Sequence, residues 1–322
     1  MGRPLAMVFY EMVARGGGTP RVLSSAERLV YNDRSHHTPK KSMPALLISS
    51  QELAERRGDA DVVICDCRHD LMDLEKGRGA YAEGHIPGAH FLHLDEDLSG
   101  KKTGKNGRHP LPDIAAFASK MGAIGIDSNK RVIAYDDAGG PYAARLWWLL
   151  RWLGHDNVAV LDGGINKWLA EGRPTDRNLP TARPATFVAK LKNAMTVDAD
   201  FLMANIKQPT SVVVDARAPE RYRGETEPID PVAGHIPGAL NRLFKNNLTA
   251  DGTFKTTATL KQEFSELLSG KLPSQVINQC GSGVTACHNL LALEIAGLSG
   301  SKLYPGSWSE WCADPARPVA TG

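Results

Sequence analysis

The chain has 322 residues, of which 42% are hydrophobic and 23% charged, a balance typical of a soluble globular enzyme with two domains. No run approaches 18 apolar residues, so the sequence predicts no membrane span. The 38 Lys and Arg nearly cancel the 36 Asp and Glu, and a near-neutral body gives no electrostatic reason to expect nucleic acid or a membrane surface as a partner.

The first 43 residues differ from the rest in charge and pattern. They hold seven basic and three acidic residues, three consecutive glycines and no sustained apolar period. Such a segment cannot repay the entropy cost of ordering itself, so we expect residues 1–43 to be a disordered basic extension. A mitochondrial-type presequence is the alternative, against which the three acids argue.

The remainder contains an internal repeat. The hexapeptide Gly-His-Ile-Pro-Gly-Ala stands at 84–89 and again at 234–239, and three further pairs of segments match in the same order. Four ordered matches predict one domain written twice, with a first domain over 44–174, a linker over 175–185 and a second domain over 186–322. In this alignment Asp137 of the first copy takes the place of Cys280 of the second.

Short β-branched runs alternate with helical patterns in both copies. In the first copy we expect strands at 62–64, 131–135 and 158–161 and helices at 114–121, 142–153 and 165–170. In the second copy the strands are 212–214, 275–278 and 302–304, and the helices are 260–268 and 285–296. This alternation predicts an α/β fold, in which each domain is a mostly parallel sheet with helices on both faces and ligands bind at the carboxyl ends of the strands.

One loop is suited to chemistry. The sequence Cys-Gly-Ser-Gly-Val-Thr at 280–285 follows a predicted strand and opens a predicted helix. Gly281 and Gly283 allow a tight turn with inward N–H groups, and Thr285 can cap the helix. A nest of donors at a helix N-terminus favours a thiolate or persulfide anion, so Cys280 is the predicted nucleophile.

The other four cysteines are predicted to be structural: Cys65, Cys67, Cys287 and Cys312. Sulfurs two residues apart on a strand diverge, and Cys287-His288 lacks a second ligand pair, so we expect neither a metal nor another cofactor. Five cysteines cannot all pair, which predicts reduced thiols and a cytoplasmic location.

From about residue 46 onward the sequence resembles the two-domain rhodaneses, which are thiosulfate and 3-mercaptopyruvate sulfurtransferases. Tyr81 with the motif at 84–89 and the run Leu-Tyr-Pro-Gly-Ser-Trp-Ser-Glu-Trp at 303–311 carry the resemblance, and the loop of Cys280 is of the mercaptopyruvate type. The resemblance implies two rhodanese-like domains, of which the first is inactive and closes the cleft. It also implies a cycle in which Cys280 takes sulfur from a small-molecule donor as a persulfide and passes it to cyanide, a thiol or a protein acceptor.

The residues after Cys280 bear on the donor. Gly281, Ser282, Gly283 and Val284 include no base, whereas loops that prefer thiosulfate carry basic residues. By the same resemblance Ser282 would polarise mercaptopyruvate and Arg221 would bind the donor's anionic end. The second arginine usual in mercaptopyruvate enzymes is missing from 225–233, so Arg223 is a substitute candidate and thiosulfate stays open as the donor.

Two histidines stand in the repeated hexapeptide. Because His85 recurs as His235, a structural hydrogen bond is the simpler interpretation of both. The alternative for His85 is a relay that faces Ser282 with Asp70 or Asp73. Two internal ion pairs are also predicted, Asp66–Arg68 and Asp215–Arg217.

Two other functions compete with sulfur transfer. A Cdc25-like phosphatase shares this architecture, but its loop requires an arginine where this chain has Ala286. A non-enzymatic sulfur carrier or partner-binding module remains an alternative, which release of pyruvate or sulfite would exclude.

Overall fold

A computed structural model describes residues 45–322; the predicted basic extension lies outside the described residues. Residues 45–170 form a five-stranded parallel sheet in the order β1-β5-β4-β2-β3. Its strands are β1 (Leu47–Ile48), β2 (Val62–Asp66), β3 (Ala89–Phe91), β4 (Arg131–Tyr135) and β5 (Val158–Leu161). The helices are α1 (Ser50–Arg56), α2 (Lys76–Glu83), α3 (Ile114–Ala123), α4 (Pro141–Trp152) and α5 (Gly164–Ala170).

The second half repeats this plan with four parallel strands in the order β7-β6-β8-β9. The strands are β6 (Val212–Asp215), β7 (Leu240–Asn241), β8 (Val276–Gln279) and β9 (Lys302–Leu303). The α-helices are α6 (Ala199–Lys207), α7 (Pro219–Tyr222), α8 (Thr257–Leu268), α9 (Thr285–Ile295) and α10 (Ser307–Trp311). Short 3-10 turns lie at Asn193–Met195, Phe244–Asn247 and Pro273–Gln275.

Each sheet is covered on both faces, as predicted. In the first sheet Ile64 and Ile133 pack with α1 and α5, while their neighbours Val63 and Val132 face α3 and α4. In the second sheet Ile277 packs under α6 and α10. Successive residues of a strand face opposite sides of the sheet, and both sides are buried here. The strands are therefore continuous apolar segments in the sequence.

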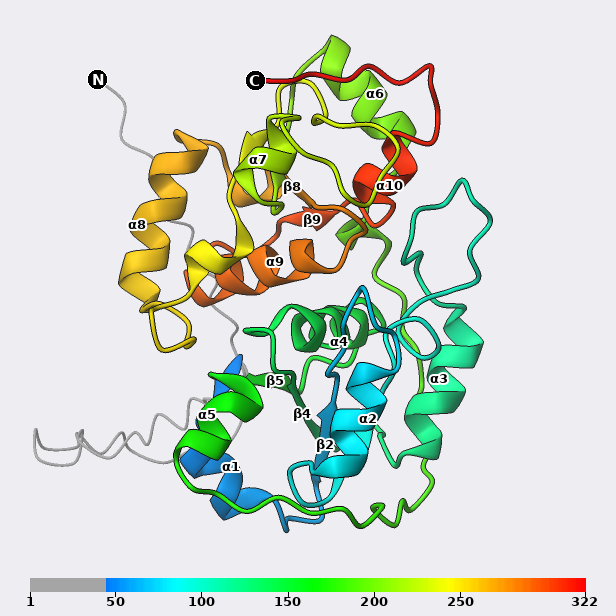
Figure 1. Cartoon of the computed structure of the whole chain (residues 1–322), viewed down its shortest axis with the longest axis vertical. Helices are drawn as coiled ribbons and strands as arrows, with labels where there is room; N and C mark the ends of the chain where they lie inside the picture. The colour runs from blue at the N-terminus through cyan, green and yellow to red at the C-terminus, as the bar shows by residue number, and fades with distance from the viewer. Residues whose placement is uncertain (1–44) are drawn as a thin grey trace, which may run out of the picture. The chain divides into compact units, whose positions relative to one another are not determined.

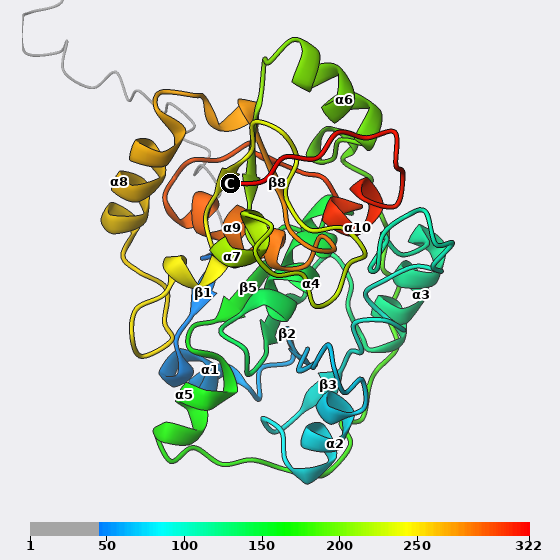
Figure 2. The ribbon, with the colours of Figure 1, turned by 45° about the horizontal axis from the view of Figure 1, so that its top comes forward.

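The two halves share one hydrophobic core. Helix α4 lies between the first sheet and α9 of the second half (Figure 1), and the same order is visible in Figure 2. The buried α4 side chains Trp147 and Leu150 belong to one cluster with Leu290 and Leu293 of α9. This packing sets the first domain directly against the loop that precedes α9.

The strand registers align the two copies residue by residue. Asp66 pairs with Tyr135 in the first sheet, and Asp215 pairs with Gln279 in the second. The residue after Tyr135 therefore corresponds to the residue after Gln279, so Asp136 occupies the position of Cys280. The prediction that placed Asp137 there is wrong by one residue, because the first copy's loop differs in spacing from its second-copy counterpart.

The segment between the copies carries no α-helix or strand from the end of α5 to the start of α6. Its backbone is hydrogen-bonded to the first half, where Asp176 exchanges two bonds with His85 and the Ala185 N–H donates to the Gly122 carbonyl. The linker bounds of 175–185 stay a prediction.

Both predicted internal ion pairs are present and buried. The Arg68 Nη2 lies 2.7 Å from Asp66 Oδ2 and 2.8 Å from the Gly84 carbonyl. Arg217 makes the same two bonds, at 2.7 Å each, to Asp215 and Gly234. Each pair therefore ties its strand, β2 or β6, to the Gly-His-Ile-Pro-Gly-Ala turn of the same domain.

We expect Asp66→Asn to lower the free energy of unfolding by about 3–5 kcal/mol, because it leaves the Arg68 charge buried without its partner. Urea denaturation followed by circular dichroism measures this loss. Asp59→Asn is the control, since Asp59 pairs with Arg56 on the surface and should cost about 1 kcal/mol or less. Equal effects of the two substitutions would contradict the interpretation.

Candidate functional site

Cys280 follows β8 directly and lies at the base of the loop that opens α9. Its side chain is 2% exposed, and the Gly283 N–H donates to Cys280 Sγ at 3.2 Å. Gly283 has a φ of +79°, and a Cβ at this position would meet the Pro305 carbonyl oxygen at 2.4 Å. Glycine is thus required for the turn that aims a backbone donor at the sulfur.

The start of α10 fixes the outer side of the loop. The N–H groups of Trp308 and Ser309 donate at 2.9 Å to the carbonyls of Cys280 and Gly281. The Ser307 hydroxyl accepts from the Cys280 N–H at 3.1 Å. The prediction that Thr285 caps α9 is wrong. Val284 is the N-cap residue, and no side chain forms a capping hydrogen bond there.

A cavity of about 420 Å³ opens above the sulfur. Both halves of the chain contribute to its wall, since Leu71, Arg108 and Tyr142 belong to the first and the remainder to the second. The other lining residues include the loop residues Cys280, Gly281, Ser282, Val284 and Thr285, together with Ala216, Arg217, Ala218, Glu220, Arg221, Leu243, Phe244 and Lys245.

Ser282 contacts a histidine of the first domain. Its Oγ lies 2.7 Å from His109 Nδ1, and both side chains are buried. On the far side, His109 Nε2 faces Asp95 Oδ1 at 3.7 Å, and Lys102 Nζ lies 2.6 Å from the same oxygen. Burial lowers the pKa of His109 far below its ordinary value, and the nearby charge of Arg145 acts in the same direction. A neutral His109 can accept the Ser282 proton at Nδ1 while Nε2–H faces the Asp95 carboxylate.

This arrangement corrects the alternative interpretation of His85. His85 Nδ1 lies 2.9 Å from the Tyr81 carbonyl and Nε2 lies 3.2 Å from the Asn178 carbonyl, so both nitrogens contact backbone groups and not Ser282. His235 makes the equivalent Nδ1 contact with the Tyr222 carbonyl at 2.7 Å. Neither Asp70 nor Asp73 takes part in a relay, and the simpler structural interpretation of the two histidines is confirmed.

Two arginines lie over the cysteine loop. A Cβ on Gly281 would meet Arg108 Nη2 at 2.9 Å and Arg221 Nη1 at 3.7 Å. Asp230 bridges them, paired with Arg108 on one oxygen and lying 3.2 Å from Arg221 Nη2 on the other. Burial raises the pKa of Asp230 against the opposing effect of Arg108. The first domain thus places an arginine beside Arg221, although residues 225–233 contain none.

Arg223 does not substitute for the arginine that is missing from residues 225–233. Its guanidinium pairs with Glu225 at 2.6 Å, the side chain is 42% exposed and it does not line the cavity. Arg221 itself also bonds to Glu227, with Nη2 at 2.6 Å from Oε1.

The first copy's loop holds a carboxylate where the second holds sulfur. Asp136 Oδ1 accepts from the N–H groups of Ala138 and Gly140 at 2.9 and 2.8 Å, and Oδ2 accepts from those of Tyr142 and Ala143 at 2.9 Å each. Burial raises the pKa of Asp136 to about 6, with the N–H donors opposing. The nest of the first domain is thus filled by its own side chain.

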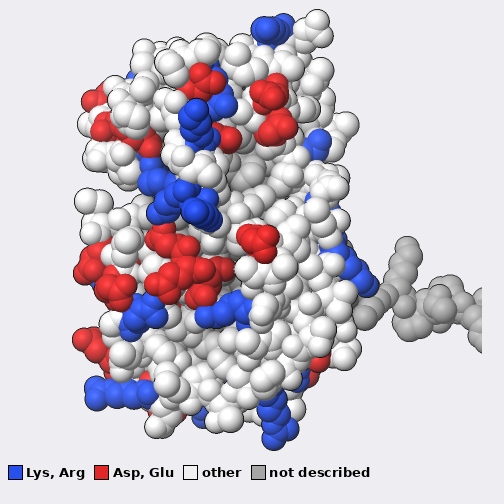
Figure 3. All heavy atoms as spheres, turned by 90° about the vertical axis from the view of Figure 1, so that its right-hand side faces the viewer, with Lys and Arg blue, Asp and Glu red and all other residues white. Residues whose placement is uncertain are grey.

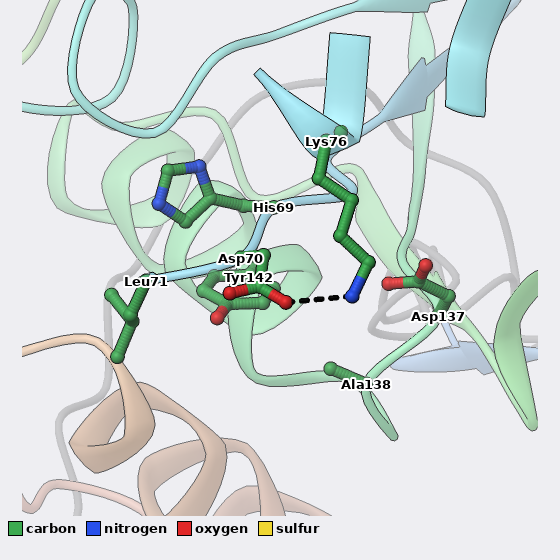
Figure 4. Close-up of a pocket in the computed structure, with 8 residues that line it drawn as sticks. His69, Asp70, Leu71, Lys76, Asp137, Ala138 and Tyr142 are labelled. Atoms are coloured by element: carbon green, nitrogen blue, oxygen red, sulfur yellow. Dashed lines mark hydrogen bonds and ion pairs between the residues drawn. The ribbon is translucent and has the colours of Figure 1, made fainter. Parts of the chain in front are cut away.

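A second cavity, of about 350 Å³, lies beside this loop (Figure 4). Lys76 extends into it and pairs with Asp70 at 2.7 Å, and the Asp137 carboxylate points into the same space. Asp137 lines this cavity and is not held in the nest. The cavity shares Leu71 and Tyr142 with the one above Cys280.

All five cysteines are free and buried. Burial raises the pKa of Cys287 to about 12 and that of Cys65 further, so these thiols stay protonated. His69, His93 and Asp95 bring potential ligand atoms within 4.8 Å. Both His93 nitrogens already bond to backbone groups, of Leu74 and of Asp95, which leaves an incomplete ligand set.

On the face shown in Figure 3, basic and acidic side chains lie next to one another, as a near-neutral body predicts. Within residues 45–322, no helix is long and apolar enough to cross a bilayer.

The chain belongs to the rhodanese family. A model of the rhodanese-like domain matches residues 49–171 and 198–314, which confirms the tandem repeat of two such domains. Over 280 residues the chain is 49% identical to a protein of Pseudomonas aeruginosa named "Probable 3-mercaptopyruvate sulfurtransferase", covering 86% of this chain and 99% of that one. It is 36% identical to the thiosulfate sulfurtransferase of Bos taurus, covering 86% and 95%. The solved 3-mercaptopyruvate sulfurtransferase of Leishmania major superposes with a TM-score of 0.75 at 30% identity, covering 85% of this chain and 75% of that one.

The corrected alignment of the two loops makes a testable prediction. Asp136→Asn should lower the free energy of unfolding by about 1–3 kcal/mol, because an amide cannot accept from all four buried N–H groups. Asp137→Asn is the matched neighbour and should change it by about 0.5 kcal/mol or less. Thermal or urea unfolding measures both. A larger loss in Asp137→Asn than in Asp136→Asn would contradict the interpretation that the Asp136 carboxylate fills the nest.

Proposed function

We propose that the chain is a sulfurtransferase in which Cys280 accepts sulfur from 3-mercaptopyruvate and passes it to a thiol or cyanide. The observation that carries the proposal is the position of Cys280 Sγ. It lies against a backbone donor in the wall of a cavity that is also lined by three arginines and by a serine paired with a neutral histidine. The sulfurtransferase names of the relatives support the reaction class.

In the first half-reaction the Cys280 thiolate attacks the sulfur of the donor. A new S–S bond forms, the C–S bond breaks, and its electron pair leaves on carbon as the enolate of pyruvate. The proton of the donor thiol passes to the enolate carbon to give pyruvate, and the enzyme keeps the persulfide anion. In the second half-reaction an acceptor thiolate or cyanide attacks the outer sulfur and returns the Cys280 thiolate.

The Ser282 hydroxyl is suited to stabilise the enolate that forms from the donor carbonyl in this step. Its hydroxyl lies in the cavity wall and is hydrogen-bonded to His109 at 2.7 Å. The Ser282 O–H can turn from His109 Nδ1 to donate a hydrogen bond to the developing enolate oxygen, because a positioned donor stabilises the charge that forms there. Thiosulfate leaves as sulfite and forms no enolate.

Arg108 and Arg221 are proposed to hold the anionic end of the donor. Both guanidinium groups approach Gly281 from above the sulfur, and a planar guanidinium suits a carboxylate or a sulfonate. The same pair favours thiosulfate as the second candidate donor, because its dianion would also lie between them.

The donor assignment is tested by initial rates with mercaptopyruvate and with thiosulfate against cyanide. We expect the wild-type chain to prefer mercaptopyruvate. We expect Ser282→Ala to slow that reaction by about 100-fold or more, the usual contribution of a positioned donor to a developing oxyanion, and to spare transfer from thiosulfate. Cys280→Ser should abolish both reactions, including release of pyruvate and of sulfite. A preference for thiosulfate, or equal losses with both donors in Ser282→Ala, would reject mercaptopyruvate.

The anion site is tested separately by substituting each arginine. Arg108→Ala and Arg221→Ala should each lower kcat/KM for the donor by roughly 10 to 150-fold, since a charge-assisted bond in a partly desolvated cleft contributes about 1.5–3 kcal/mol. Transfer from preformed persulfide to cyanide should change little. Arg223→Ala is the control, because Arg223 is exposed and paired with Glu225. Unchanged donor kinetics in Arg108→Ala would show that the first domain does not bind the donor.

A further inference from the structure

Arg145 is a fully buried charge at the boundary between the two domains. It extends from α4 of the first domain, and its side chain has no solvent exposure. Its Nη1 donates to the Gly283 carbonyl of the cysteine loop at 3.1 Å, and its Nη2 donates to the His109 carbonyl at 3.1 Å. Two longer contacts, at 3.4 Å, reach the carbonyls of Leu98 and Pro110. All four partners are neutral backbone groups.

The ion pairs around the cavity leave Arg145 without a counter-charge. Three other arginines near the loop are matched by three carboxylates: Arg217 by Asp215, Arg221 by Glu227, and Arg108 by Asp230. In the part of the chain that the structure describes, no carboxylate forms a salt bridge with Arg145. Burial lowers the pKa of Arg145, but from so high a starting value a guanidinium remains protonated. A buried charge of this kind requires an anion nearby.

Two sulfur atoms are the candidates for that anion. Cys287 Sγ donates to the same Gly283 carbonyl at 3.3 Å, and its raised pKa keeps it a neutral thiol. Cys280 Sγ accepts the Gly283 N–H. Gly283 thus joins Arg145, through its carbonyl, to the sulfur of Cys280, through its N–H.

We propose that Arg145 is a positioning residue whose charge, delivered from the first domain, stabilises the thiolate and persulfide anions on Cys280. The guanidinium fixes the carbonyl of Gly283, and so the conformation of the residue whose N–H points at the sulfur. It also supplies a positive charge that no carboxylate neutralises, unlike the charges of the neighbouring arginines. The same charge helps to keep His109 neutral. A first domain without a nucleophile is thereby required for the reactivity of the second.

The other charged groups that face Cys280 do not replace this charge. Arg217 is paired with Asp215 and Glu227, and Arg108 and Arg221 share Asp230. Glu220 and Lys245 line the cavity from α7 and from the turn at Phe244–Asn247, but both are exposed. Arg145 is therefore the group to vary.

The test is the pH profile of alkylation of Cys280 by iodoacetamide, read by mass spectrometry of the peptide that contains it. Arg145→Gln, which keeps N–H donors but removes the charge, should move the midpoint of the profile upward by roughly one unit, as expected for loss of a nearby opposite charge. Arg145→Lys keeps the charge but not the planar guanidinium, so its midpoint should stay closer to that of wild type. Arg151→Met is the matched control, because Arg151 on the same helix pairs with Glu294 of α9 at 3.3 Å and does not contact the loop.

Equal midpoints in folded Arg145→Gln and wild type would overturn the proposal, and Arg145 would then only hold the two domains together. Equal shifts in Arg145→Gln and Arg145→Lys would overturn it as well. A measurement on chains with Arg145 intact covers the case in which the variants do not fold. The unfolding free energy of wild type relative to Cys280→Ser should rise with pH, up to the ordinary ionisation range of a free thiol, because only the folded state stabilises the thiolate. A difference that does not change with pH would also overturn it. The inference takes Cys280 as the sulfur-carrying residue, but alkylation is read without turnover, so the two can fail separately.

Discussion

The packing of α4 against α9 is the constraint on which the site depends. It buries apolar side chains of both helices in one core and so fixes the first domain against the loop of Cys280. Three side chains of the first domain reach that loop as a result: His109 at Ser282, Arg108 above Gly281, and Arg145 at the Gly283 carbonyl. Because apolar packing of this extent is rigid on the scale of a hydrogen bond, it can hold these contacts without a ligand.

The two domains use the same loop for opposite purposes. In the second domain the turn after the strand leaves its inward N–H group for a sulfur atom that can change its charge and its partner. In the first domain the carboxylate of Asp136 takes four N–H groups and closes the nest. The same loop therefore leaves a backbone N–H group available to the sulfur in one domain, whereas in the other domain its N–H groups are bonded to the Asp136 carboxylate. The closed copy contributes two arginines and a histidine that contact the cysteine loop, and no nucleophile.

Much of this organisation could be predicted from the sequence, because the repeat and the loop of Cys280 are contiguous patterns. The alternation of strands and helices, the buried ion pairs and the structural histidines follow from local spacing and were confirmed. The position of Asp136 could not be assigned securely, since adjacent aspartates differ by one residue and only the register of β4 with β2 separates them. His109 and Arg108 were missed because they lie in an irregular segment of the first domain. Their partners are far away in the sequence, and only tertiary packing brings them together.

The central claim is that Cys280 carries the transferred sulfur within a site completed by the first domain. It is tested most directly by incubating the wild-type chain with mercaptopyruvate, without an acceptor, and locating the added sulfur by mass spectrometry of the peptides. The account predicts one sulfur atom on the peptide that contains Cys280, released as thiocyanate when cyanide is added. Sulfur on the peptide of Cys65, Cys67, Cys287 or Cys312, or pyruvate release with no adduct on Cys280, would contradict it.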